Sequence, residues 1–262
     1  MPSDVAPGPV QPGPVGPGPV ALVGSGEYLD AMTELEGRLI DGRPPRYVQI
    51  PTAAAPEGEH VLARWLQLGA DQAERLGVEQ VAIVARDRHD ADDPDLAAQV
   101  AGAGLIYLSG GNPGFLASTL RDTALWRAIV AAWQGGAALA GCSAGAMAIT
   151  SWAPSSRNWG LGGEPGLDLV PQWRVIPHFD RFGAWMPSPI LKRVAKTPDG
   201  VSTVGIDEET ALVTGLDSEG EWVVYGRRKV WLVDDRGKRT GHEGGRSVPV
   251  PSARMRPSSG GV

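Results

Sequence analysis

Short apolar runs alternate with longer amphipathic stretches along the first half of the chain. Residues 60–76 and 115–133 carry apolar side chains at near-helical spacing, which predicts two helices. The short runs have the length and residue types of buried strands and cover residues 20–23, 47–50, 81–84, 105–108 and 137–140. Strands that alternate with helices indicate a mostly parallel sheet with helices on both faces. We therefore expect an α/β fold.

The pattern changes after residue 178. Four further apolar runs follow one another with short polar connections, at residues 202–206, 210–213, 222–225 and 229–233. This spacing is typical of antiparallel strands joined by hairpins. We expect these strands to extend one edge of the same sheet.

Neither end of the chain shows such a pattern. The first twenty residues repeat Pro-Gly-Pro-Val at a period of five, which is typical of a disordered or polyproline-like arm. From residue 236 the chain consists largely of Gly, Arg, Ser and Pro. We expect a Pro/Gly-rich arm over residues 1–19, a single α/β domain over 20–235 and a disordered tail over 236–262.

Composition narrows the range of partners. The net charge of -6 and the lack of basic runs interleaved with aromatic residues argue against a nucleic-acid surface. Every apolar stretch is shorter than a bilayer span, and the first residues do not resemble a secretory signal. The single cysteine excludes an internal disulfide. We expect a soluble, cytoplasmic protein; whether it forms a homodimer stays open.

The run Gly141-Cys142-Ser143-Ala144-Gly145 lies between the last apolar run of the first half and an Ala/Met-rich helical stretch. A serine between two glycines at a strand-to-helix junction predicts a nucleophile elbow, because only glycine fits beside so sharp a turn. The amide of Ala144 would point at an oxyanion formed on an attacked carbonyl. A structural turn of small residues is the alternative.

A nucleophilic serine needs a base and an acid. Of the four histidines, only His178 follows an apolar, strand-like run, where doubly wound sheets place catalytic groups. Glu208 and Glu209 stand in an acidic junction between two predicted strands, and a charged turn is the other interpretation.

Two glycine-containing turns complete the candidate chemistry. The stretch Ser109-Gly110-Gly111-Asn112 follows a strand, so its amides, above all that of Gly111, could complete an oxyanion hole, while Asn112 could cap the next helix. The stretch Gly24-Ser25-Gly26-Glu27 lacks the third glycine of a dinucleotide fingerprint, so we expect a plain turn there.

Taken together, six motifs in order resemble the cyanophycinase and dipeptidase E family of serine peptidases. The resemblance spans roughly residues 21–233. The motifs are Gly24-Ser25-Gly26-Glu27, Pro51-Thr52-Ala53, Ile106-Tyr107-Leu108-Ser109-Gly110-Gly111-Asn112, Gly141-Cys142-Ser143-Ala144-Gly145-Ala146, Pro177-His178-Phe179 and Gly205-Ile206-Asp207-Glu208-Glu209-Thr210-Ala211.

The resemblance implies a three-layer α/β/α sandwich of the class I glutamine-amidotransferase type. It implies a Ser143-His178-Glu208 triad with Glu209 as the second choice of acid, and no metal or cofactor. The Gly111 and Ala144 amides would bind the oxyanion, in a substrate site that includes Asn112 and Arg181. Family members favour Asp-containing peptides or isopeptides, so Arg181 could contact a substrate carboxylate; a solvated surface charge is the other interpretation.

Two departures leave the substrate open. Pro113 and Ile176-Pro177 stand where cyanophycinases commonly carry polar residues, which argues against hydrolysis of the cyanophycin polymer. We therefore expect a serine hydrolase acting on a small peptide or related amide. A non-catalytic binding protein of the same fold and an amidotransferase-like glutaminase using Cys142 are the alternatives.

Overall fold

An eight-stranded mixed sheet forms the centre of the protein. The computed structural model describes residues 16–154, 163–183, 186–217 and 220–250. The strand order is β14-β11-β10-β1-β5-β4-β2-β3. The five parallel strands are β1 (Val20–Val23), β5 (Ala138–Cys142), β4 (Leu105–Leu108), β2 (Arg46–Ile50) and β3 (Glu79–Ala82), and the antiparallel ones are β10 (Thr210–Thr214), β11 (Trp222–Gly226) and β14 (Ser247–Val248).

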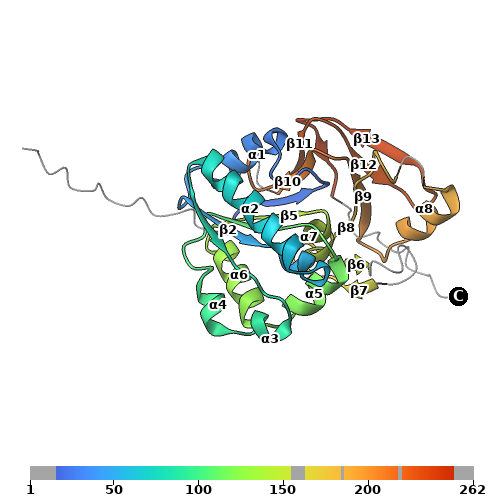
Figure 1. Cartoon of the computed structure of the whole chain (residues 1–262). Coiled ribbons are helices and arrows are strands. Elements are labelled where there is room, and N and C mark those ends of the chain that lie inside the picture. The colour runs from blue at the N-terminus through green and yellow to red at the C-terminus, as the bar shows by residue number, and fades with distance from the viewer. Residues whose placement is uncertain (1–15, 155–162, 184–185, 218–219, 251–262) are drawn as a thin grey trace, which may run out of the picture.

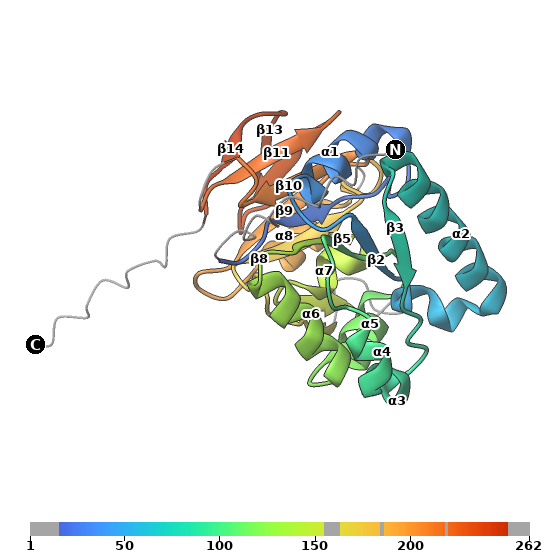
Figure 2. The same cartoon turned by 90° about the vertical axis from the view of Figure 1, so that its left-hand side faces the viewer.

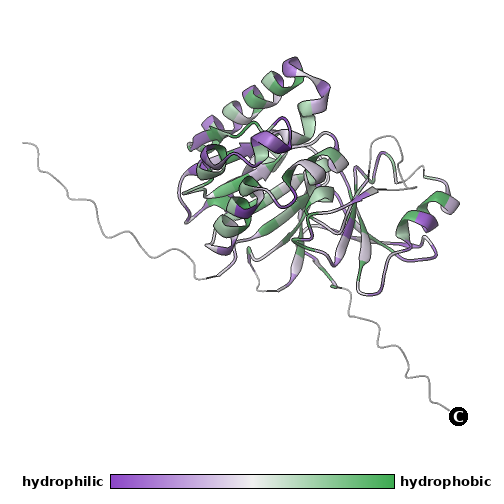
Figure 3. Ribbon diagram, turned by 90° about the horizontal axis from the view of Figure 1, so that it is seen from below, coloured by the Kyte–Doolittle hydropathy of each residue, from purple (hydrophilic) through white to green (hydrophobic). Residues whose placement is uncertain are grey.

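Helices cover both faces of this sheet (Figures 1 and 2). On one face, side chains such as Ala21 and Tyr107 pack against α1 (Asp30–Ile40) and α2 (Glu59–Leu76). Their strand neighbours Leu22 and Ile106 point to the other face, which is covered by α3 (Arg88–Ala91), α4 (Pro94–Ala98), α5 (Pro113–Leu120), α6 (Ala124–Gln134) and α7 (Ala144–Ala148). Figure 3 shows hydrophobic strands between helices of mixed polarity. The expected three-layer α/β/α fold is confirmed.

The second predicted helix is in fact two. Residues 115–133 are interrupted after α5, and the chain turns through Asp122 at φ 59° before α6 begins. The Thr123 side chain accepts the Trp126 N–H and caps the new helix. Apolar periodicity continued across the break because both helices pack on the same face of the sheet, so the pattern alone did not reveal the turn.

The C-terminal strands do not all extend the central sheet, contrary to our expectation. Of the four strands predicted after residue 178, only β10 and β11 join it, with β10 beside β1 and β11 beside β10. A separate four-stranded sheet has the order β13-β12-β9-β8, formed by β8 (Trp173–Pro177), β9 (Ser202–Ile206), β12 (Val230–Val233) and β13 (Arg239–His242), with α8 (Ser188–Ala195) beside it (Figure 1). Apolar spacing predicts strands but not their partners, because strands of both sheets are buried apolar runs.

The remaining short elements pack against α5. They are a hairpin of β6 (Trp152–Pro154) and β7 (Gly163–Pro165) and the 3₁₀ helix η1 (Thr52–Glu57). α7 contacts β6 and β8, so the elbow lies where the two sheets meet.

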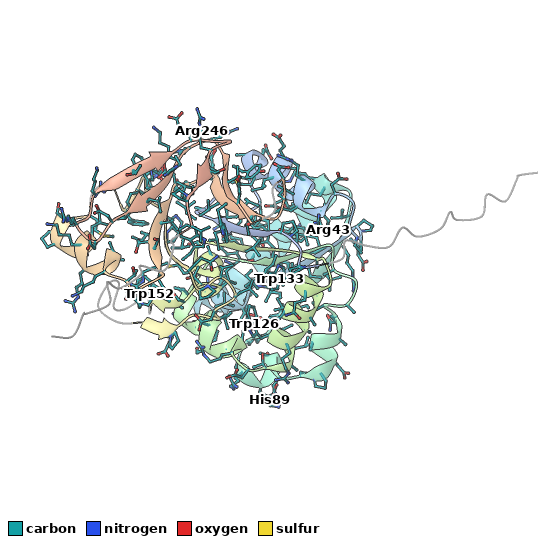
Figure 4. The ribbon with its side chains drawn as sticks, turned by 180° about the vertical axis from the view of Figure 1, so that it is seen from behind. Arg43, His89, Trp126, Trp133, Trp152 and Arg246 are labelled. Carbon is teal, nitrogen blue, oxygen red and sulfur yellow. The ribbon has the colours of Figure 1, made fainter. Side chains whose placement is uncertain are left out.

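The folded domain extends further at both ends than we expected. Beyond residue 235, β13 pairs with β12, and β14 pairs with β11 and buries Val248. These edge strands carry few apolar residues, so they resembled a tail. At the other end, Gly18 and Pro19 are buried, and Gly18 exchanges hydrogen bonds with Trp133 (Figure 4). Residues 1–15 and 251–262 lie outside the described residues.

Over the described residues, none of the helices combines the length and the apolar character needed to cross a membrane.

Candidate active site

Ser143 stands at the apex of the turn between β5 and α7. Its backbone has φ 50° and ψ −105°, a strained conformation for a residue with a side chain. Both flanking glycines are required: a Cβ on Gly141 would lie 2.5 Å from the Gly145 carbonyl carbon, and one on Gly145 would lie 2.2 Å from the Leu108 oxygen. The turn therefore has the geometry of the predicted nucleophile elbow.

His178 follows β8 and reaches the serine. Its Nε2 lies 2.7 Å from Ser143 Oγ, a hydrogen-bonding distance. The His178 backbone has φ 136°, which turns the chain sharply at the end of the strand. The ring of Phe182 packs edge-on against the imidazole, with 5.8 Å between the ring centroids. The predicted pairing of this serine with this histidine is present.

Parallel pairing of β8 and β9 brings an acid to the same imidazole. Pro177 lies opposite Ile206, so the residues that follow each strand emerge side by side. Glu208 Oε1 lies 3.4 Å from His178 Nδ1. The Glu209 side chain instead forms an ion pair of 3.0 Å with Arg227. Of the two acids left open by the sequence, Glu208 is the one that contacts the histidine.

Arg181 and Asp180 hold Glu208 in place. Arg181 Nε donates to Glu208 Oε2 at 3.2 Å, and Asp180 Oδ1 accepts the Glu208 N–H at 3.0 Å. The guanidinium of Arg228 binds Asp180 in turn. The Arg181 side chain remains 67% exposed, so its position beside the site also leaves it accessible to a ligand.

The loop after β4 carries the predicted oxyanion amides and is fixed at several points. Gly111 has φ 137°, and a Cβ there would lie 2.4 Å from the Ala53 oxygen, so only glycine fits. The same Ala53 oxygen accepts the Asn112 N–H, and Asn112 Oδ1 caps α5 by accepting the Phe115 N–H. The Pro51-Thr52-Ala53 motif thus supports this loop. The Ala144 N–H lies in the first turn of α7, where helical amides have no intrahelical acceptor.

Glu27 is a residue of the site that our sequence reading missed. The stretch from Gly24 to Glu27 is more than the plain turn we expected. Gly24 packs against the Asp207 oxygen, and the Ser25 oxygen accepts the Glu209 N–H. Glu27 itself bonds to Gly110 and Cys142. Gly24 and Gly26 were the signal in the sequence that this turn packs closely against another segment, because each glycine allows one backbone to approach another.

Cys142 points away from the elbow into the core on the α1–α2 side. It is fully buried, and its thiol donates to Glu27 Oε2 at 2.7 Å. Burial, with the nearby Glu27 charge, raises the pKa of the thiol well above its usual value. A thiol so placed is a poor nucleophile, which disfavours the glutaminase alternative.

One group in the described part of the chain could hold a metal ion by its spacing. It consists of Asp87, His89 and Asp90, on and beside α3. Figure 4 shows His89 at the opposite end of the molecule from Arg246. Asp87 caps the helix by accepting the Asp90 N–H, and Asp90 accepts the Arg86 N–H, so these carboxylates already serve local structure.

Known proteins resemble this chain over most of its length. It matches peptidase family S51 over residues 20–218. Cyanophycinases from Trichormus variabilis and from Nostoc sp. are each 28% identical to it over 207 residues, covering 74% of this chain and 65% of theirs. One from Synechococcus elongatus is 29% identical over 172 residues, covering 62% of this chain and 51% of its own. The chain thus spans only 51–65% of the length of these curated relatives.

Solved structures show the same architecture. A peptidase from an acI-B1 Actinobacterium is 40% identical, covers 89% of this chain and 97% of its own, and superposes with a TM-score of 0.81. A putative Peptidase E protein from Listeria monocytogenes EGD-e is 19% identical, covers 80% of this chain and 99% of its own, and has a TM-score of 0.54. The second likeness shows the fold alone.

Proposed function

Because the chain belongs to peptidase family S51, we propose that it is a serine-type peptidase that cleaves a small peptide or isopeptide through an acyl-enzyme on Ser143. The observation that carries the proposal is the 2.7 Å contact between Ser143 Oγ and His178 Nε2 at a strained elbow. A base at this distance can remove the hydroxyl proton as the oxygen attacks a carbonyl.

The proposed reaction has two halves. Ser143 Oγ bonds to the substrate carbonyl carbon while His178 takes its proton, and the carbonyl oxygen becomes an oxyanion. The C–N bond then breaks, and His178 gives the proton to the leaving amine. Water then attacks the carbonyl carbon of the resulting ester while His178 takes a proton from it. The C–Oγ bond breaks, and His178 returns the proton to Ser143 Oγ, which releases the acid.

Glu208 and the two amides have supporting roles in this scheme. Glu208, at 3.4 Å from His178 Nδ1, would orient the imidazole and stabilise its positive charge. The Gly111 and Ala144 N–H groups would bind the oxyanion. Support comes from the contact of Gly111 with Ala53, which fixes that loop, and from the place of Ala144 at the start of α7.

The position of Arg181 supports the proposal that the substrate carries a carboxylate. Arg181 lies beside the triad acid and is largely exposed, so its guanidinium could bind a carboxylate of the peptide. The curated relatives are named cyanophycinases. Pro113 and the Ile176-Pro177 pair differ from the polar residues common in that group, so we propose a small Asp-containing peptide or isopeptide rather than the polymer.

Amino acids released from a library of Asp-initiated and β-Asp-linked dipeptides test this function. We expect turnover by the wild-type protein and none by Ser143→Ala. Glu164→Gln, an exposed change on β7, is a matched control and should keep full activity. Equal turnover by Ser143→Ala and wild type would refute the assignment of Ser143. Silence of a wild-type protein that also fails to react with a fluorophosphonate would favour a binding protein.

A further inference from the structure

The carboxylate of Glu27 joins the two segments that carry the proposed oxyanion donors. Its Oε1 accepts the Gly110 N–H at 3.1 Å, and its Oε2 accepts the Cys142 thiol at 2.7 Å. Gly110 immediately precedes Gly111, and Cys142 lies two residues before Ala144. One side chain therefore connects both halves of the proposed oxyanion hole.

The sheet topology explains why a residue after β1 can do this. β1 and β4 are the two parallel neighbours of β5, so the loops after all three strands leave the same edge of the sheet. Glu27 belongs to the loop after β1, the elbow follows β5, and Gly110 follows β4. The Glu27 side chain crosses the end of β5 and reaches the loop on its far side.

The fit around this carboxylate is close. A Cβ on Gly110 would lie 2.7 Å from Glu27 Oε1, so any larger residue would displace the carboxylate, and the same Cβ would be in van der Waals contact with the Cβ of Ser143 at 3.6 Å. The neighbouring Ser109 hydroxyl is bonded to the Tyr28 hydroxyl at 2.7 Å. Consecutive residues, Glu27 and Tyr28, thus hold consecutive residues of the oxyanion loop.

We propose that Glu27 is a positioning residue that sets the separation of the Gly111 and Ala144 N–H groups through its bonds to Gly110 and Cys142. The inference rests on the proposed function, since an oxyanion forms only if Ser143 attacks. Donors of this kind stabilise the oxyanion because they are held in place before the reaction, and loss of one donor typically lowers the rate by about 10²–10³.

The role depends on an acceptor oxygen and not on the charge. Gln at position 27 keeps an oxygen for the Gly110 N–H and has an N–H that the Cys142 sulfur can accept, whereas Ala removes both contacts. Ser at position 142 keeps a donor for the carboxylate. Glu27→Gln and Cys142→Ser are therefore conservative variants, and Glu27→Ala is the disruptive one.

The rate of phosphonylation of Ser143 by a fluorophosphonate tests this inference without knowledge of the substrate. The maximal inactivation rate, the concentration for half-maximal rate and the pH profile are measured for wild type and the three variants. We expect Glu27→Ala to lower the maximal rate by roughly 10- to 100-fold, with a similar half-saturating concentration. The pH profile should keep its shape, because Ser143 and His178 are unchanged.

The conservative variants and thermal unfolding separate positioning from folding. We expect Glu27→Gln and Cys142→Ser to react within about threefold of wild type, as expected if the hydrogen bonds carry the effect. Wild-type rates in a folded Glu27→Ala variant would overturn the inference and leave the proposed function intact. Equal losses in Glu27→Ala and Glu27→Gln would overturn it too, because the charge would then be the cause. A wild-type protein that does not react would overturn both proposals.

Discussion

Two adjacent glutamates in the turn between β9 and β10 have different surroundings. Glu208 contacts His178 and Arg181, whereas Glu209 contacts Arg227 and has φ 54°. The motif around these residues limited the candidate acid to this pair, and we expected only one of the two neighbours to face the site. It could not choose between them, because the choice depends on the bend that leads from one sheet to the other.

This difference predicts unequal effects of matched substitutions. Glu208→Gln should lower kcat by about 10²–10⁴, since an amide would hold the imidazole in the wrong tautomer. Glu209→Gln should leave kcat within a few-fold, because Glu209 pairs with the exposed Arg227 and does not contact His178. Initial rates on the peptide found to be cleaved measure both. Similar losses of kcat in the two variants would contradict the assignment of Glu208 as the acid.

A second residue-scale prediction concerns Glu36, which is buried between α1 and the sheet. Its Oε2 accepts hydrogen bonds from Gln72 and Tyr47, while Oε1 has no partner among the described residues. Burial raises its pKa from the usual 4.5 to about 7. The folded protein thus binds this proton more tightly than the unfolded chain does. Stability from this group is complete below pH 4.5 and is lost as the pH rises through 7.

Glu36→Gln should remove that dependence. We expect the free energy of unfolding to fall between pH 5 and pH 8 by roughly 2–4 kcal/mol less in the variant than in wild type. Urea unfolding at both pH values measures this difference. Glu34→Gln, an exposed change on the same helix, is the control and should follow wild type. Parallel pH dependence of wild type and Glu36→Gln would show that Glu36 does not titrate in this range.

At the scale of elements, apolar spacing predicted most strands and failed where neighbours decide. β1, β4 and β9 begin and end where expected, because each is a largely buried run followed at once by glycine or a polar residue. The sequence did not show that β9 and β12 belong to a second sheet, because their pairing is set by the bend after β9. β13 and β14 were missed because edge strands bury few side chains.

The edge strand β14 should nevertheless contribute to stability. Val248 is 2% exposed and pairs with Trp222 on β11, whereas Val250 is 43% exposed. Val248→Ala should lower the free energy of unfolding by roughly 1–2 kcal/mol, which corresponds to a fall in Tm of about 2–8 °C. Val250→Ala is the matched control and should change Tm little. Equal melting temperatures for Val248→Ala and wild type would mean that the fold ends before β14.

At the scale of the whole molecule, the proposed catalytic residues come from two different sheets. Ser143 follows β5 of the central sheet, whereas His178 and Glu208 follow β8 and β9 of the second one. The site therefore forms only when both sheets are folded and packed together (Figure 2). The motifs identified these residues in the sequence, but only the arrangement of the sheets explains how positions 35 residues apart, as Ser143 and His178 are, come within 2.7 Å.

The most direct test of the account is the intact mass of the protein after treatment with a fluorophosphonate, followed by peptide mapping. We predict one adduct per chain, located on Ser143. The adduct should be absent in Ser143→Ala and should form much more slowly in His178→Ala, because the hydroxyl then lacks its base. An adduct that persists in Ser143→Ala, or that forms at the wild-type rate in His178→Ala, would contradict the account.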